Sequence, residues 1–323
     1  MGASWLEPQD GVQVAVLTRN GKLESAHQGV VVVSDFAGQN LFERGNGEAI
    51  VFPRSTLKPI QTIASLKMGA TPSSDHLALS TSSHCGSRDH RGLVQDFLNT
   101  YGLDESSLKC PEDWPLGIQE RAELIAQGDG PSRLAMNCSG KHAGFLATSI
   151  QMGLPTDTYL DSSHPLQLTI SETIAEYSGE RPSMTTVDGC GAPLHAISMR
   201  GLSKAIAKIA SRKTRLEKDL VDAVVEHPWI VDGHGRNNTV TIETLGNIAK
   251  IGAEGLVVIG TSEGVAVAVK IIDGSMRATS LVAVEALKLV GAISDGDHER
   301  LCDILKFDVW GGSMISGGLE VSL

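Results

Sequence analysis

The sequence lacks several features that would place it in particular protein classes. It has no apolar stretch long enough to cross a bilayer, and its start has neither the basic nor the apolar segment of a signal peptide. No block of five like charges occurs, and the net charge of -11 disfavours nucleic acid and anionic membranes as partners. Five cysteines in 323 residues, an odd number, argue against a disulfide framework. We therefore expect a cytoplasmic protein without nucleic-acid or membrane partners.

The order of hydrophobic patterns along the chain predicts an α+β fold. Alternating valines at 12–16, an Asn20-Gly21 turn and an apolar run at 30–33 predict an opening β-hairpin. Apolar residues at helical spacing predict a first helix over 57–68. The same criteria predict helices at 116–127, 143–152, 165–178, 203–212, 216–225 and 278–290, and strands at 255–259, 265–272 and 317–323. We expect the N- and C-terminal strands to share one antiparallel sheet, with a helical region between them.

The sharpest chemical pattern is a serine and a lysine three residues apart, Ser55 and Lys58. On a helix these two side chains face the same way. A serine hydroxyl becomes a good nucleophile when a base takes its proton, and a lysine is such a base only when burial or a nearby cation keeps it neutral. Pro59 disfavours helical angles at Lys58, so we expect an irregular first turn. The pattern predicts a Ser-Lys nucleophile, and a helix cap with a solvated lysine is the alternative.

Other polar segments offer a second hydroxyl, thiols and a further lysine. The run at 80–90 is rich in serine and histidine, and a hydroxyl there would relay a proton to a leaving group. Cys138 and Cys190, each among glycines and polar residues, form a soft metal site only with help from a neighbour such as His142, because no C-x-x-C spacing is present. Buried free thiols are the alternative. Lys270 ends an apolar strand, as a second base or as an ordinary strand-end charge.

Seven segments in this order resemble one family, the rhizobial-type L-asparaginases, also called the asparaginase II family. The resemblance runs from about residue 11 to the C-terminus and is far more specific than any one motif. The segments are RSTLKP at 54–59, SSHCGSRDH at 82–90, MNCSGKHAGFL at 136–146, DGCGAPLHAISM at 188–199, PWIVDGHGR at 228–236, KIGAEG at 250–255 and AVKIIDGSMRA at 268–278. The family's fold is similar to that of serine β-lactamases, which implies the same fold here.

The resemblance implies two Ser-Lys pairs around one acyl centre. Matched by motif, Ser55 is implied as the nucleophile and Lys58 as its base. Ser83 matches the family's second serine and Lys270 its second lysine. The implied reaction hydrolyses L-asparagine to L-aspartate and ammonia, and glutamine, one methylene longer, stays open as a side substrate.

The resemblance also implies substrate-binding and metal-binding residues. Arg54 and Asp188 are implied to line the site, with His142 as a neighbour on the substrate side. A zinc ion that tunes substrate binding is implied, and its ligands would be Cys138, Lys141 and Cys190. The chain departs from the family at Cys85-Gly86-Ser87, where Asn-Gly-Glu or a close variant is usual, and this puts the substrate contacts of that loop in question.

The expected organisation is a single catalytic unit over 1–323 that acts as a homodimer. Within it, a sheet part over 1–60 and 250–323 and a helical part over 61–249 are the expected division. Two other functions stay open. A β-lactamase or peptidase-like serine hydrolase is one, although S-D-N and K-T-G are absent from the chain. A non-catalytic relative that binds an amino acid is the other, and it would not need two Ser-Lys pairs.

Overall fold

A computed structural model describes residues 4–323, so the first three residues of the expected 1–323 unit lie outside the described part. Within 4–323, eight strands form one sheet in the order β10-β11-β1-β2-β9-β8-β7, with β3 paired to β2. The strands are β1 (Val12–Arg19), β2 (Lys22–Asp35), β3 (Asn40–Arg44), β7 (Ala249–Gly252), β8 (Leu256–Gly260), β9 (Val265–Ile271), β10 (Asp308–Gly311) and β11 (Met314–Val321). Every pair in this sheet is antiparallel.

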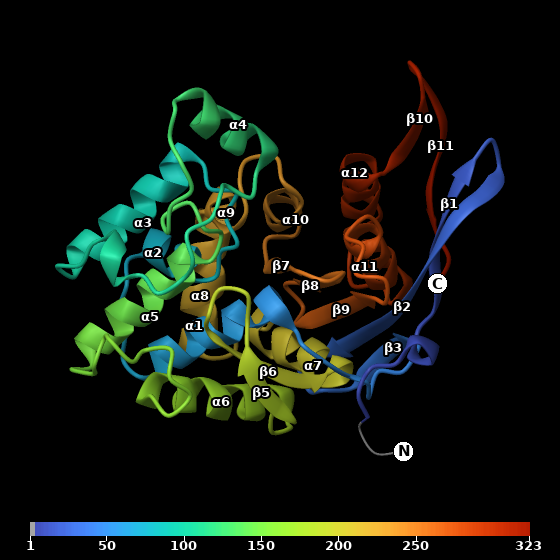
Figure 1. Ribbon diagram of the computed structural model, residues 1–323. Coiled ribbons are helices and arrows are strands. Elements are labelled where there is room, and N and C mark those ends of the chain that lie inside the picture. The colour runs from blue at the N-terminus through green and yellow to red at the C-terminus, as the bar shows by residue number, and fades with distance from the viewer. Residues whose placement is uncertain (1–3) are drawn as a thin grey trace.

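The sheet joins the two ends of the sequence, which confirms the predicted α+β class. Strand β2 pairs with β9 along seven residues, and β1 pairs with β11. Helices fill the region between these strands, and a small three-stranded sheet of β4 (Ile50–Val51), β5 (Met184–Val187) and β6 (Pro193–Ser198) lies among them. In Figure 1 most helices of this middle region gather on one side of the molecule and the main sheet lies on the other, with α7 beneath the sheet.

Helices cover both faces of the main sheet. Helix α7 (Met199–Ala210) packs on β2 and β9 from one side, and α11 (Thr279–Leu289) packs on the same strands from the other (Figure 1). Residues 30–33 in β2 are therefore fully buried in succession rather than alternately. This explains why the sequence shows an unbroken apolar run there.

The remaining helices form the other half of the molecule or pack against α11. They are α1 (Lys58–Lys67), α2 (Ser74–Ser80), α3 (Arg88–Thr100), α4 (Ile118–Ala126), α5 (Ser139–Gln151), α6 (Pro165–Ser178), α8 (Arg215–Glu226), α9 (Pro228–Val231), α10 (Asn237–Leu245) and α12 (Asp295–Leu305). Helix α12 packs against both α11 and α10. No helix within 4–323 is long and apolar enough to span a membrane.

Most predicted elements are present within a few residues of their expected bounds. The opening hairpin, the helix from 57, and the late strands and helix agree with β1, β2, α1, β8, β9, α11 and β11. The irregular turn expected before Pro59 is the 3-10 turn η2 (Arg54–Leu57), which leads directly into α1. Helices α2, α3, α9, α10 and α12 are not among the predicted ones. Helices α2 and α9 span only seven and four residues, and α3 and α12 are polar with a short apolar stripe.

Candidate active site

A cavity of about 630 Å³ brings together residues from distant parts of the chain. Its wall includes η2, the loop after α2, the turn before α5, the loop before β6, the loop before α10, and the end of β7. The lining residues are Arg54, Ser55, Ser83, Leu116, Met136, Asn137, Cys138, Asp188, Gly189, Cys190, Asp232, Gly235, Arg236, Asn237, Asn238, Ile251, Gly252, Ala253 and Met276. Its size and its mixture of apolar and polar groups are those of a small-molecule site.

Ser55 lies on the cavity wall in a turn that the backbone holds in a costly conformation. The residue before it, Arg54, has a φ of 54°, in the left-handed region that non-glycine residues seldom adopt. Such strain persists where surrounding contacts enforce it, and it is concentrated at functional sites. Within 4–323 no hydrogen bond engages the Ser55 hydroxyl, which is therefore available to a bound molecule.

Lys58 is fully buried beneath the cavity and bonds to the second serine. Its Nζ donates to Ser83 Oγ at 2.9 Å, to the carbonyl of Ser82, and to Cys138 Sγ at 3.1 Å. Burial lowers the pKa of Lys58, although Cys138 opposes this shift. A lysine with a lowered pKa bonded to a serine hydroxyl is suited to accept and return a proton, and no hydrogen bond joins it to Ser55 within 4–323.

Two glycines in α5 set the position of the loop that carries Ser83. A Cβ at Gly140 would lie 2.6 Å from the carbonyl oxygen of Leu79, and a Cβ at Gly144 would lie 2.5 Å from Ser80 Oγ. Only glycine lets α5 approach the end of α2 this closely. The loop leaving α2 then turns into the cavity, where the Ser83 amide donates to Val231 O at 2.9 Å.

Lys250, to which no sequence motif gives a role, is a further functional candidate. It lies on β7, is fully buried, and donates from Nζ to the carbonyl of Ile251 at 2.8 Å. Burial and the neighbouring charge of Lys58 lower the pKa of Lys250 to about 7. Lys250 begins the segment KIGAEG, which is one of the seven segments of the family resemblance, and the three residues after it line the cavity. The segment could therefore have pointed to Lys250 as a site residue.

Lys270 does not lie where the predicted Ser83–Lys270 pair requires it. Its Nζ donates to the backbone carbonyls of Glu254 and Ile271, and the residue is absent from the cavity wall. Ser83 instead accepts its hydrogen bond from Lys58. The prediction failed because a lysine near a strand end is a common pattern. The position of the strand within the sheet decides which residues the lysine contacts, and sequence does not show that position.

Two Arg-Asp pairs give the cavity both signs of charge. Arg54 Nε lies 2.8 Å from Asp188 Oδ1, and Arg236 Nε lies 2.6 Å from Asp232 Oδ1. Burial alone would raise the pKa of Asp188, but Lys141 and Arg54 hold it below its ordinary value. The cavity therefore presents both carboxyl and guanidinium groups near its two serines.

The L-asparaginase II family matches residues 15–318, nearly the whole chain. The chain belongs to the asparaginase II family. Membership makes it a hydrolase of amides or esters, in agreement with the resemblance read from the seven segments. A comparison with curated proteins found no match.

Solved structures resemble this asparaginase II family member only distantly. A β-lactamase from Mycobacterium bovis shares 15% identity with a TM-score of 0.46, covering 82% of this chain and 95% of its own. Mglu in its glutamate form shares 11% identity with a TM-score of 0.47, covering 82% of this chain, which spans 61% of the Mglu chain. EstCE1, a hydrolase with promiscuous acyltransferase activity, shares 11% identity with a TM-score of 0.35, covering 92% and 93%. Similarity at this level carries no information on substrate.

The residues expected to bind zinc form one buried group at the edge of the cavity. Lys141 Nζ lies 3.0 Å from Cys190 Sγ. A hydrogen bond with Cys138 and the charge of Lys141 lower the pKa of Cys190 to about 4, despite its burial. Burial alone would lower the pKa of Lys141, but the two sulfurs raise it. Two sulfurs, one of lowered pKa, fit a soft or borderline divalent ion such as zinc, and Lys141 would join them as a ligand only after losing its proton.

Two other expected contacts lie outside the cavity wall. His142 is fully buried in α5, and its Nδ1 is 2.7 Å from Tyr159 Oη, so its ring does not line the site as a substrate contact would. In the atypical Cys85-Gly86-Ser87 segment, Cys85 is buried behind the loop at Gly233, and Ser87 Oγ caps α3 by accepting from the His90 amide. This segment thus supports the cavity from behind.

Proposed function

We propose that this family member hydrolyses L-asparagine to L-aspartate and ammonia, with Ser55 as the nucleophile. The observation that carries the proposal is the hydrogen bond of 2.9 Å between buried Lys58 and Ser83, next to Ser55 in one cavity. Lys58 is thus a base of lowered pKa bonded to one of the two serines that line the cavity. A protein that only bound an amino acid would not need to bury a lysine against a serine, because burying a cation is costly.

The charges of the cavity suit an α-amino acid. A guanidinium group, Arg54 or Arg236, would pair with the substrate's α-carboxylate in the two-point geometry that arginine favours. Asp188 or Asp232 would accept from the α-ammonium group. Because both ends of the amino acid would be held, the side-chain amide would be the part presented to Ser55.

The proposed reaction has two steps. Ser55 Oγ attacks the amide carbon while neutral Lys58 takes its proton, and the Ser83 hydroxyl passes a proton from Lys58 to the departing nitrogen. Water then attacks the aspartyl ester and restores Ser55. Backbone N–H groups of Ser55 and Ala253 are the proposed donors to the oxyanion, since β7 ends beside η2.

Lys250 would tune the base. The charge of Lys58 lowers the pKa of Lys250, as that of Lys141 lowers the pKa of Lys58. Because the interaction of two buried ammonium groups is mutual, Lys250 in turn would disfavour the charged form of Lys58. We assign no part in proton transfer to Lys270, because Ser83 is bonded by Lys58 and the Nζ of Lys270 bonds two backbone carbonyls, of Glu254 and Ile271, and no serine.

A zinc ion, when bound, would be held by Cys138, Lys141 and Cys190 and would supply positive charge at the edge of the cavity. Lys141 would have to give up a proton to serve as a ligand. The ion pair of Lys141 with Cys190 and the contact of Lys58 with Cys138 hold these groups in place. The homodimer and the cytoplasmic location stay predictions.

The test measures ammonia and aspartate release from L-asparagine, with L-glutamine and a chromogenic β-lactam in parallel, for wild type, Ser55→Ala and Ser163→Ala. Ser163 is exposed and outside the cavity, so it is the matched control. We expect Ser55→Ala to lose at least about 10³-fold in kcat with an unchanged circular dichroism spectrum. An active Ser55→Ala would contradict the role of Ser55, and turnover of the β-lactam alone would overturn the substrate assignment.

A further inference from the structure

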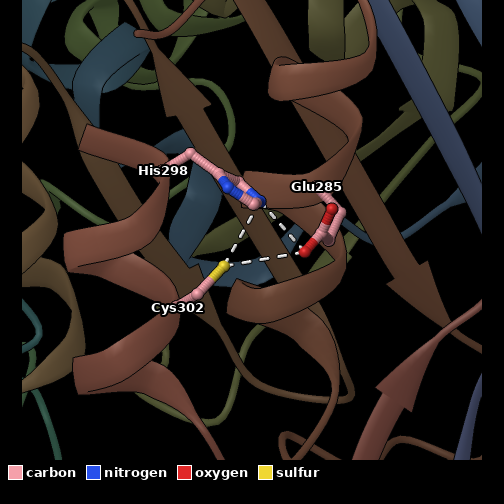
Figure 2. A group of neighbouring side chains, drawn as sticks. All are labelled: Glu285, His298 and Cys302. Carbon is pink, nitrogen blue, oxygen red and sulfur yellow. Dashed lines mark hydrogen bonds and ion pairs between the residues drawn. The ribbon is translucent and has the colours of Figure 1, made fainter. Parts of the chain in front are cut away.

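Three metal-ligating side chains meet between α11 and α12, away from the cavity. Glu285 comes from α11, and His298 and Cys302 come from α12 (Figure 2). His298 Nε2 lies 3.0 Å from Glu285 Oε1 and 3.3 Å from Cys302 Sγ, and Cys302 Sγ lies 3.6 Å from Glu285 Oε1. None of the three lines the cavity described above.

We propose that Glu285, His298 and Cys302 form a second metal site, for a borderline divalent transition-metal ion such as zinc. Carboxylate oxygen, imidazole nitrogen and thiolate sulfur are the three ligand types that zinc uses in proteins. Bonds of about 2.0–2.3 Å in a tetrahedron separate neighbouring ligand atoms by about 3.3–3.6 Å. The observed separations are close to these, so the ion requires only small side-chain movements.

The placement of the ligands favours an ion over a simple hydrogen-bonded cluster. His298 and Cys302 are four residues apart on α12, so both point at α11 from one helical face, as the paired ligands of helical zinc sites do. Within 4–323 no lysine or arginine forms an ion pair with Glu285. With the thiol deprotonated and the imidazole neutral, the three groups carry two negative charges, which a divalent ion balances.

The ion would exchange with solvent and would stabilise the packing of α12 on α11. The His298 and Glu285 side chains are 21% and 33% exposed, which leaves access for the ion and a fourth position for water. Binding releases the Cys302 thiol proton to solvent and joins α12 to α11. Helix α12 also packs on α10, whose first residues line the cavity. An ion that holds α12 in place would therefore also help to hold α10 and this part of the cavity wall.

Cobalt titration of metal-free protein tests the proposal, because thiolate-bound Co²⁺ gives a sulfur-to-metal charge-transfer band. The Cys190→Ser background removes a ligand of the proposed cavity site, so the remaining band reports on the second site. In that background, we expect Glu285→Gln, His298→Gln and Cys302→Ser each to lose one bound ion per chain and the band, while Glu299→Gln, an exposed neighbour on α12, keeps both. Equal cobalt uptake and equal bands in all four variants would overturn the site.

Zinc-soaked crystals of the unmodified protein give a second measurement that does not depend on any variant folding. An anomalous peak among Glu285 Oε1, His298 Nε2 and Cys302 Sγ supports the proposal. No peak there at saturating zinc would reject it, leaving a hydrogen-bonded cluster. Metal-free protein should also gain a few degrees in Tm on zinc addition, and Cys302→Ser should lose part of that gain.

Discussion

Lys250 and Lys270 have nearly the same local structure and very different surroundings. Each is on a strand of the main sheet, and each donates from Nζ to the carbonyl of the following residue, at 2.8 Å and 2.9 Å. Lys250 is on β7, the last strand of the sheet, which packs against the η2 turn that carries Ser55. Lys270 is on β9, between β2 and β8, and a second carbonyl, of Glu254, also accepts from it. The position of its strand in the sheet therefore decides whether a lysine lies near the candidate catalytic residues.

The largest expected difference lies between Lys58 and Lys270. Lys58→Met removes the proposed base and should lower kcat at least about 10³-fold, whereas Lys270→Met should change kcat by less than about threefold. Steady-state kinetics with L-asparagine measures both, and circular dichroism controls for folding. Equal losses in the two folded variants would show that Lys270 matters to catalysis as much as Lys58 does.

A smaller effect is expected from Lys250→Met, and its signature is a shift with pH. The neutral form of Lys58 is the active one, so kcat/KM rises with pH through the pKa of that base. Because the interaction of the two buried lysines is mutual, removing the charge of Lys250 should raise the pKa of Lys58, so the rising limb should move to higher pH with a loss of roughly several-fold at neutral pH. The pH profiles of wild type, Lys250→Met and Lys270→Met are the measurement, and an unshifted limb in Lys250→Met would contradict the coupling.

The smallest effect is on stability, and its sign is opposite to the effect on activity. Folding lowers the pKa of Lys250 from its ordinary 10.5 to about 7, so the unfolded chain binds more protons between these values. Burial of this lysine therefore costs most stability at and below about pH 7, and the cost fades as the pH rises toward 10.5. Lys250→Met should raise Tm by about 2–4 °C at neutral pH, and by less at about pH 9. Calorimetry at the two pH values checks this, and a lower Tm at neutral pH would show that the lysine stabilises the fold.

Much of the fold was predictable because it depends on local patterns. The Asn20-Gly21 turn with flanking valines fixes the hairpin of β1 and β2. Pro59 accounts for the 3-10 turn before α1, and the apolar spacing accounts for α1 itself. The chain-order argument for a shared sheet also succeeded, since two end segments of strand type have few other partners.

The candidate site was predictable only in part. Segments that carry Ser55, Lys58, Ser83, Arg54 and Asp188 were recognised from the sequence, and the structure brings these residues to one place. The expected partner of Ser83 was Lys270, whereas the structure shows Lys58. Sequence motifs could not decide this, because Lys58, Lys250 and Lys270 all lie in segments of the family resemblance. Asp232 and Arg236 were inside a recognised segment without an assigned role, since their pairing is not visible in sequence.

The sequence by itself determined the short-range features of this protein: a serine and a lysine within one turn, an opening hairpin, the absence of a spanning helix, and family membership through seven ordered segments. Only the tertiary structure decided that Lys58 bonds to Ser83 and that Lys250 is buried near Lys58. It also decided that Glu285 lies against His298 and Cys302 of the next helix. Local patterns depend on backbone angles and hydrophobic period, which neighbouring residues set. Contacts across many residues depend on sheet order and helix packing, which the chain settles only by folding as a whole.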